Sequence, residues 1–287
     1  MREILELRIP EDLARQYLPR DIGETIGDIV LVREVVVEPG DAVFGVIRET
    51  ELALKRKGQF LLTSVRQCRH YSKQELDSAE LLTLVIDPMF EPAGEQCGTL
   101  YDDSEACPLC LAPRRQASDL RLDLRAIPKS KGAAVSIARN ELVFKDELCQ
   151  AISRAALSGI EFRPVLHCKP PVRRAAPLVW WQPWLTSHPV PAAAQTKFGT
   201  SIFADECQQD EYRCPNGPVV GLQLLSELYL TRAEWDGSDF VRTREYIGVR
   251  RGLLNPHQIV AVSQRARMII ESTRPKGIAF EVAHLVS

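Results

Sequence analysis

The stretch Leu142–Val165, "LVFKDELCQAISRAALSGIEFRPV", decides how this chain folds, because a second copy of it follows 118 residues later. The second copy is "VAVSQRARMIIESTRPKGIAFEVA" at 260–283. In both copies apolar residues recur at i, i+3, i+4 and i+7, the spacing of one helix face. Each copy therefore predicts an apolar strand, a helix of about three turns, a glycine stop and a second strand.

The matching positions of the two copies are core and turn positions. Gly159 and Gly277 are expected to end the helices in a left-handed conformation. Ser263 is expected to cap the second helix, whereas Lys145 stands at the matching position of the first, where Asp146 is expected to cap one residue later. These residues serve the fold rather than catalysis. The apolar face of the first helix recurs in the second, as Leu148, Ala151, Ile152 and Ala155 followed by Ala266, Ile269, Ile270 and Thr273.

Composition places the chain among ordinary globular proteins, with 287 residues, 45% hydrophobic and 26% charged. Its net charge of −2 argues against a nucleic-acid partner, because a general nucleic-acid binder carries a basic field. The N-terminal residues lack the apolar core of a secretory signal, and no apolar run is long enough to span a membrane. We therefore expect a cytoplasmic protein without a membrane partner, whose eight cysteines are thiols or metal ligands.

A cysteine-rich stretch at 94–113, "GEQCGTLYDDSEACPLCLAP", predicts a zinc-ribbon-like insertion. Cys107-Pro-Leu-Cys110 has the spacing of a knuckle in which two thiolates bind one metal ion. Cys97-Gly98 is similar to the second half of another knuckle, whose first cysteine would stand at position 94, where the chain has glycine. The stretch therefore predicts one Zn²⁺ bound by Cys97, Cys107 and Cys110, with one ligand missing.

The fourth ligand must come from elsewhere, because structural zinc is almost always four-coordinate. Cys68 is the preferred residue and His70 the second, both from "QCRHY". Alternatively, the site has decayed and its thiols are ordinary ones. Cys149 lies on the first repeated helix, and we expect it in the core. Further ligands could come from the pairs His167–Cys168 and Cys207–Cys214.

The overall organisation predicted is an α+β protein of two related strand–helix–strand parts, with the zinc-ribbon-like insertion in the first. The segment 169–196 holds six prolines and three of the four tryptophans, which predicts a linker between domains at 1–168 and 197–287. The tryptophans are predicted to bind a partner, although they could instead anchor the linker to its own core. "PVVGLQLLSELYL" at 218–230 is predicted to be a helix. The tryptophans in question are Trp180, Trp181 and Trp184.

No phosphate-binding loop, dinucleotide fingerprint, nucleophile elbow or zinc-protease motif occurs in the sequence. The charged turn containing Asp236 and Asp239 could support a hydrolase. The basic segment 113–131 beside the knuckle could support a nucleic-acid-binding zinc protein. Both are kept as alternatives to a protein that acts by contact with a partner.

Two segments carry a resemblance to known families. "CGTLYDDSEACPLC" and the later "YRCPNG" resemble bacterial proteins with doubled CxxCG motifs, from which this chain departs at Gly94 and Leu111. "VSQRARMIIESTRPKGIAFEVAHLV" resembles the C-terminal part of a family of immunity proteins found beside polymorphic toxins. The resemblance implies a non-enzymatic protein that binds a cognate toxin, and it brings no catalytic residues.

Overall fold

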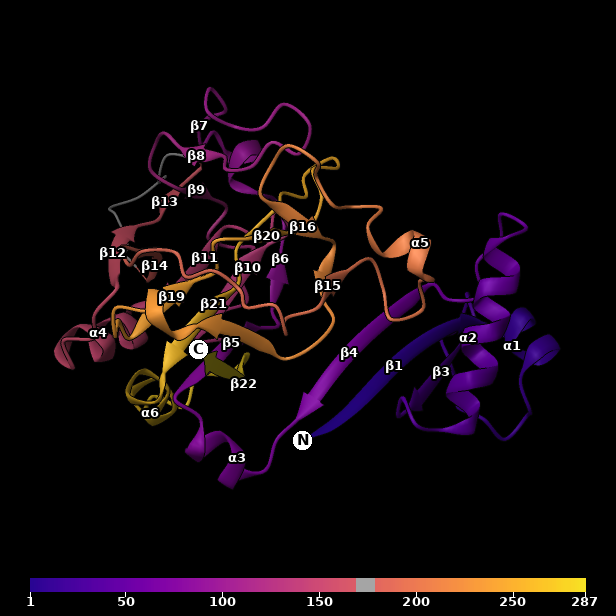
Figure 1. Ribbon diagram of the computed structural model, residues 1–287. Helices are drawn as coiled ribbons and strands as arrows, with labels where there is room; N and C mark the ends of the chain where they lie inside the picture. The colour runs from indigo at the N-terminus through magenta and orange to yellow at the C-terminus, as the bar shows by residue number, and fades with distance from the viewer. Residues whose placement is uncertain (169–178) are drawn as a thin grey trace. The chain divides into compact units, whose positions relative to one another are not determined.

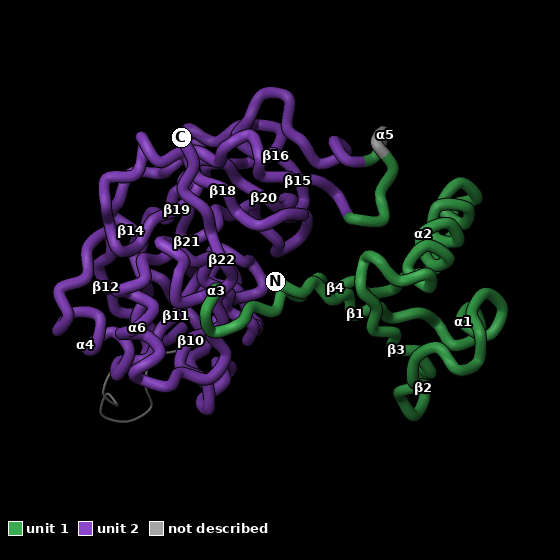
Figure 2. Tube along the Cα trace, turned by 60° about the horizontal axis from the view of Figure 1, so that its bottom comes forward, with its two compact units in different colours: residues 1–75, 202–208 green, residues 76–201, 209–287 purple. Residues whose placement is uncertain are grey.

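The computed structural model describes residues 1–168 and 179–287, apart from the side chains of residues 206 and 207. The chain has the predicted mixed α+β fold and divides into two compact units (Figure 2). Unit 1 comprises Met1–Glu75 and Ile202–Gln208, and unit 2 comprises Leu76–Ser201 and Gln209–Ser287. The boundary thus falls after residue 75, and both predicted domains, 1–168 and 197–287, contribute to unit 2. Residues 169–178 of the predicted linker lie outside the described residues.

Unit 1 is a four-stranded antiparallel sheet with two helices. Its strand order is β2-β3-β1-β4. Alternation in β1 turns Leu5, Leu7 and Ile9 into the core, where they pack with residues of α1 and α2. At the start of α1, Glu11 forms a buried ion pair with Arg33 at 2.6 Å. The elements are β1 (Arg2–Pro10), α1 (Glu11–Tyr17), β2 (Glu24–Ile26), β3 (Val32–Val37), α2 (Ala42–Lys55) and β4 (Ser64–His70), followed by α3 (Lys73–Ser78) at the boundary.

Unit 2 contains both copies of the repeated stretch, and each forms the predicted strand, helix and second strand (Figure 1). Two five-stranded sheets carry them, in the orders β12-β14-β11-β10-β6 and β18-β22-β5-β21-β19. We call β5, β10, β11, α4 and β12 the first repeat, and β14, β19, β21, α6 and β22 the second. The first repeat spans β5 (Leu81–Ile86), β10 (Ala133–Ser136), β11 (Leu142–Lys145), α4 (Asp146–Arg154) and β12 (Ile160–Pro164). The second spans β14 (Trp180–Leu185), β19 (Phe240–Arg242), β21 (Val260–Ser263), α6 (Gln264–Ser272) and β22 (Ile278–Val286).

The two repeats exchange their first strands. β14 lies antiparallel between β11 and β12 of the first repeat, and β5 lies antiparallel between β21 and β22 of the second. The registers agree, because Ile160 pairs with Leu185 just as Ile278 pairs with Ile86. β10 likewise pairs with β11 as β19 pairs with β21. The predicted relation of the two parts therefore extends to a hairpin strand and an exchanged strand on each side.

The largest core of unit 2 joins the two repeats. The helices α4 and α6 lie side by side and bury their apolar faces in it (Figure 1). Leu148 and Ile152 come from the first helix, and Ala266 and Ile270 from the second. Cys149 is 4% exposed in the same core, which confirms its predicted role.

The helix ends show why glycine recurs in both copies. The left-handed residues after the helices are Ala156 (φ 48°) and Arg274 (φ 49°), not the predicted glycines. Gly159 and Gly277 come three residues later, with φ 81° and 86°, where the next strand begins. A Cβ on Gly159 would stand 2.3 Å from the backbone oxygen of Phe240, so this position excludes side chains.

The remaining elements are short strands and short helices, of which β6 and β18 are edge strands of the two large sheets. The segment 218–230 is predicted to be a helix but forms three strands. Two of them pair with strands elsewhere in unit 2, β16 with β20 and β17 with β15. Among the described residues, no helix has both the length and the apolar character needed to cross a membrane. These elements are β6 (Met89–Phe90), η1 (Gly94–Cys97), β7 (Tyr101–Asp102), β8 (Arg115–Gln116), β9 (Arg121–Leu122), β13 (Leu166–His167), β15 (Phe198–Gly199), α5 (Glu206–Gln209), β16 (Val219–Gly221), β17 (Gln223–Leu224), β18 (Leu228–Thr231), η2 (Arg232–Glu234) and β20 (Tyr246–Ile247).

Candidate metal centre

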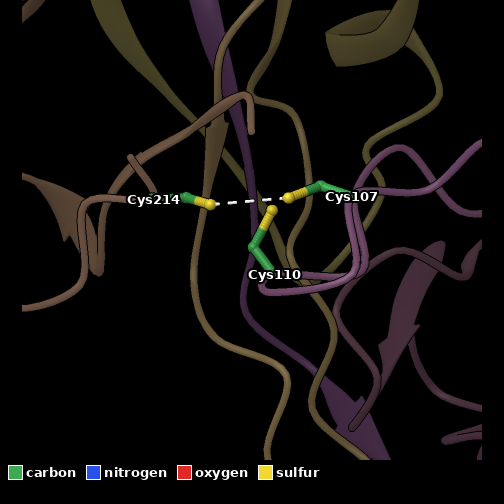
Figure 3. Close-up of side chains that lie close together, drawn as sticks. All are labelled: Cys107, Cys110 and Cys214. Carbon is green, nitrogen blue, oxygen red and sulfur yellow. Dashed lines mark hydrogen bonds between the residues drawn. The ribbon is translucent and has the colours of Figure 1, made fainter. Parts of the chain in front are cut away.

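Three cysteines of unit 2 form a cluster that could hold a metal ion. The sulfur atoms of Cys107, Cys110 and Cys214 all lie within 4.8 Å of one another (Figure 3). The Sγ atoms of Cys107 and Cys214 are 3.7 Å apart. Two thiolates bound to one tetrahedral zinc at about 2.3 Å would stand about 3.8 Å apart, so this spacing suits a shared metal ion.

Two short turns of similar construction bring these sulfurs together. Cys107-Pro-Leu-Cys110 is closed by a hydrogen bond from the Cys107 N–H to the Ala112 carbonyl, at 3.0 Å. The turn that begins at Cys214 is closed in the same way, by a 2.9 Å bond from its N–H to the Val219 carbonyl. The second turn reads Cys214-Pro-Asn-Gly217, so glycine stands where the first has its second cysteine.

The two turns belong to the two repeats. Cys214 follows Cys107 by 107 residues, the same separation that relates β19 to β10. The separation grows to 118 residues for β11 and β21, because the hairpin between β19 and β21 is 11 residues longer than that between β10 and β11. The cluster is therefore assembled from equivalent turns, one supplied by each repeat.

Gly217 lies against the sulfurs. A Cβ placed on it would be 2.5 Å from the Sγ of Cys110 and 2.9 Å from that of Cys107. Real Cβ atoms do not approach sulfur this closely, so glycine allows the second turn to close over the first. Gly217, which matches Cys110 in the second repeat, thus lets the two turns come close together but provides no thiol.

The surroundings of the thiols differ within the first turn. Hydrogen bonds from the backbone N–H groups of Cys110 and Leu109 lower the pKa of Cys107 and favour its thiolate. Burial raises the pKa of Cys110 to about 11. Because metal binding requires thiolates, loading this cluster would release protons and would be favoured by higher pH.

Only part of the predicted ligand set is brought together. Cys107 and Cys110 lie in the cluster, but Cys97 lies beside Cys168, where burial raises its pKa to about 11. Cys68 lies in β4 of unit 1, opposite Ile4, and is not a member of the cluster. A zinc ribbon confined to the insertion at 94–113 is accordingly not what the structure shows.

The alternative ligands have separate positions. His70 ends β4 in unit 1 and is paired with Arg2. The Nδ1 atom of His167 is 3.7 Å from the Sγ of Cys168. The side chain of Cys207 lies outside the described residues. Cys214, one of the alternative ligands, is the third member of the cluster. The sequence of its turn resembles the first turn only in the Cys-Pro pair.

The predicted tryptophan surface is part of a sheet. Trp180 is 3% exposed and packs in a core of unit 2. Trp181 packs against the core of the two repeats, and its indole N–H donates to Asp146 at 2.8 Å. Trp184 is half-buried, with the guanidinium of Arg163 3.5 Å from its ring centroid. The three side chains do not form one exposed surface, because alternation along β14 sends them to opposite faces.

The charged residues kept as alternatives are held by structural contacts. Asp239 is buried and accepts hydrogen bonds from Ser158 and from the Ser263 hydroxyl, the latter at 2.6 Å. In the basic segment, Arg114 is paired with Glu95 and Asp103 at 2.9 and 2.7 Å. Asp239 and Arg114 are thus held by contacts within the fold.

Comparison with known proteins returned no match to any protein-family model and none among curated proteins.

Proposed function

We propose that the protein is a zinc-stapled binding protein that acts by contact with a protein partner. Cys107, Cys110 and Cys214 would hold one Zn²⁺, whose preferred ligands include thiolates in tetrahedral arrangement. The three thiolates would fill three of the four positions of a tetrahedral zinc ion, and they come from both repeats. Zinc would therefore join the repeats at a second point, away from the core of α4 and α6.

Elemental analysis tests the zinc. Protein purified without added metal should contain about one zinc per chain. Cys107→Ser and Cys214→Ser should lose the metal and lower the melting temperature, because metal affinity is coupled to folding. Cys97→Ser and Cys68→Ser are matched controls that should retain it. A zinc content near zero in the unaltered protein, or equal loss in the controls, would contradict the assignment.

The apolar side chains exposed on unit 1 carry the partner-binding proposal. Ile29 is 96% exposed, Val30 74% and Phe60 63%, and Val36 and Val46 are also exposed. These side chains are candidate contact residues, because large exposed apolar side chains can mark a protein interaction site. The resemblance at the C-terminus suggests the partner class, a bacterial toxin neutralised by this protein as its immunity protein.

The proposal can be tested with the products of neighbouring genes. Each is co-expressed with this chain, and growth rescue and complex formation are measured. Val30→Ser together with Phe60→Ser should weaken the complex at least tenfold and abolish rescue, since interface anchors contribute about 2 kcal/mol each. Met268→Ser is the matched control, because Met268 is 58% exposed but lies on α6 of unit 2. Equal affinity of both variants would contradict a role for unit 1.

A further inference from the structure

Unit 2 has a cleft of about 530 Å³ in which the hairpins of its two repeats take part. The β10–β11 hairpin contributes Arg139 and Asn140, and the longer β19–β21 hairpin contributes Arg242, Tyr246 and His257. Trp184 of β14 also lines the cleft. The volume lies within the range of small-molecule sites, about 300–1,000 Å³. The second hairpin is 11 residues longer than the first, and its extra length helps to build this cavity.

The cleft is positively charged. No aspartate or glutamate belongs to its described lining. Arg114 and Arg115 also line it, but both are neutralised by carboxylates, Arg115 by Glu105 at 2.5 Å. Arg139 and Arg242 have no ion-pair partner in the described parts of the chain. Two uncompensated guanidinium groups in one cleft favour an anionic ligand.

Polar atoms of the lining are buried without hydrogen-bond partners. Within the described residues these are Asn140 Oδ1, Arg242 Nε and His257 Nδ1. Buried polar groups are nearly always satisfied, so three such atoms around one cavity indicate a ligand with complementary groups. Burial lowers the pKa of His257 to about 4, so its ring is neutral at pH 7 and adds no third positive charge.

The backbone of Arg139 gives an independent indication. It has φ 68°, a left-handed conformation that favours glycine or asparagine, in the turn between β10 and β11. Its N–H donates to the Ser136 carbonyl at 2.9 Å, which fixes this turn. Strained residues of this kind concentrate at binding sites, where the side chain has a role that the turn does not require.

We propose that this cleft binds a mononucleotide. The phosphate would lie between Arg139 and Arg242, which can donate several hydrogen bonds to its oxygens. The planar base would lie against the aromatic lining, which includes Trp184 and Tyr246. An exocyclic amino group of the base would donate to Asn140 Oδ1. This site is separate from the zinc cluster and from the exposed residues of unit 1.

Calorimetric titration with nucleotides and their fragments tests the ligand class. AMP, GMP and CMP should bind, and UMP, which lacks an exocyclic amino group, should bind about tenfold more weakly. Adenosine, ribose 5-phosphate and inorganic phosphate should each bind at least about tenfold more weakly than AMP. Ribose 5-phosphate binding as tightly as AMP, or no detectable binding of any nucleotide, would overturn the proposal.

A substitution at Arg139 separates binding from folding. Arg139→Gly relieves the left-handed conformation, so the melting temperature should stay equal or rise, while AMP affinity should fall about tenfold or more. Arg274→Gly makes the same change at φ 49° after α6 and should leave affinity unchanged. Arg242→Gln should also weaken AMP at least tenfold. Unchanged affinity in both cleft variants would exclude this cleft as the site.

Discussion

The two repeats of unit 2 share a backbone plan but differ in the chemistry built on it. Strand registers, left-handed residues and turn closures agree between them. In contrast, the first repeat offers two thiols where the second offers one, and the second has the longer hairpin. The comparison teaches that few residues are needed to maintain the shared backbone fold of the two repeats. The other positions can differ, and at these the cysteine cluster and the cleft are formed.

The positions required by the plan should give the largest effects. Gly159→Ala places a Cβ 2.3 Å from a backbone oxygen at φ 81°, so the free energy of unfolding should fall by more than about 2 kcal/mol. Gly237→Ala is the control, because Gly237 has φ 85° but open space around it. It should lose only about 1 kcal/mol, the conformational cost alone. Chemical denaturation measures both, and equal losses would show that the close approach is unimportant.

A helix cap present in only one repeat should give an intermediate effect. The Ser263 hydroxyl accepts from the Ala266 N–H at 3.1 Å, which confirms the predicted cap of α6. Lys145 makes no such bond before α4, and Asp146 is the first helical residue. Ser263→Ala should therefore cost about 1 kcal/mol in thermal denaturation, whereas Lys145→Ala should cost less. A larger loss at Lys145 would mean that the caps do not distinguish the repeats.

The smallest effect should be a pH dependence specific to the second repeat. Burial by itself would raise the pKa of Asp239, but hydrogen bonds from Ser263 and Ser158 hold it below the ordinary value of 3.8. Its stabilising contribution is therefore present above about pH 4 and is lost as the pH falls further. Gly132 stands at the equivalent position of the first repeat and has no carboxylate.

Asp239→Asn should accordingly lower the free energy of unfolding at pH 7, and by less at pH 3. Denaturant midpoints at the two pH values measure the difference. An equal loss at both values would assign the effect to packing rather than to the charge.

The repeated stretch could be predicted because its period and its glycines are local signals. The start of the second helix and both following strands lie where the sequence places them, whereas the first helix begins one residue earlier than its predicted cap at Asp146 implies. The left-handed residues could not be identified, because Ala156 and Arg274 carry no signature of that conformation. The segment 218–230 has helical spacing of apolar residues, but its strands are determined by distant partners such as Tyr246 and His284.

Two of the three cysteines of the cluster could be predicted, and the third required the fold. Cys107 and Cys110 have the recognisable spacing of a knuckle. Cys214 lies 104 residues beyond Cys110, and the position that would complete a second knuckle with it is Gly217. The equivalence of the two turns is hard to see in the sequence, because equivalent residues are 107 apart at the turns but 118 apart in the repeated stretch. The strand at Trp180–Leu185 was concealed by Pro183, which argues against a central strand because it donates no hydrogen bond.

The exchange of β5 and β14 has a consequence for synthesis of the chain. β5 is completed by residue 86, yet its neighbours β21 and β22 begin at residues 260 and 278. The apolar side chains of β5 therefore remain unpaired while nearly the whole of unit 2 is synthesised. During that time β5 can pair with incorrect strands. Contacts of such sequence separation also slow folding. The second repeat cannot complete its sheet until the ends of the unit meet.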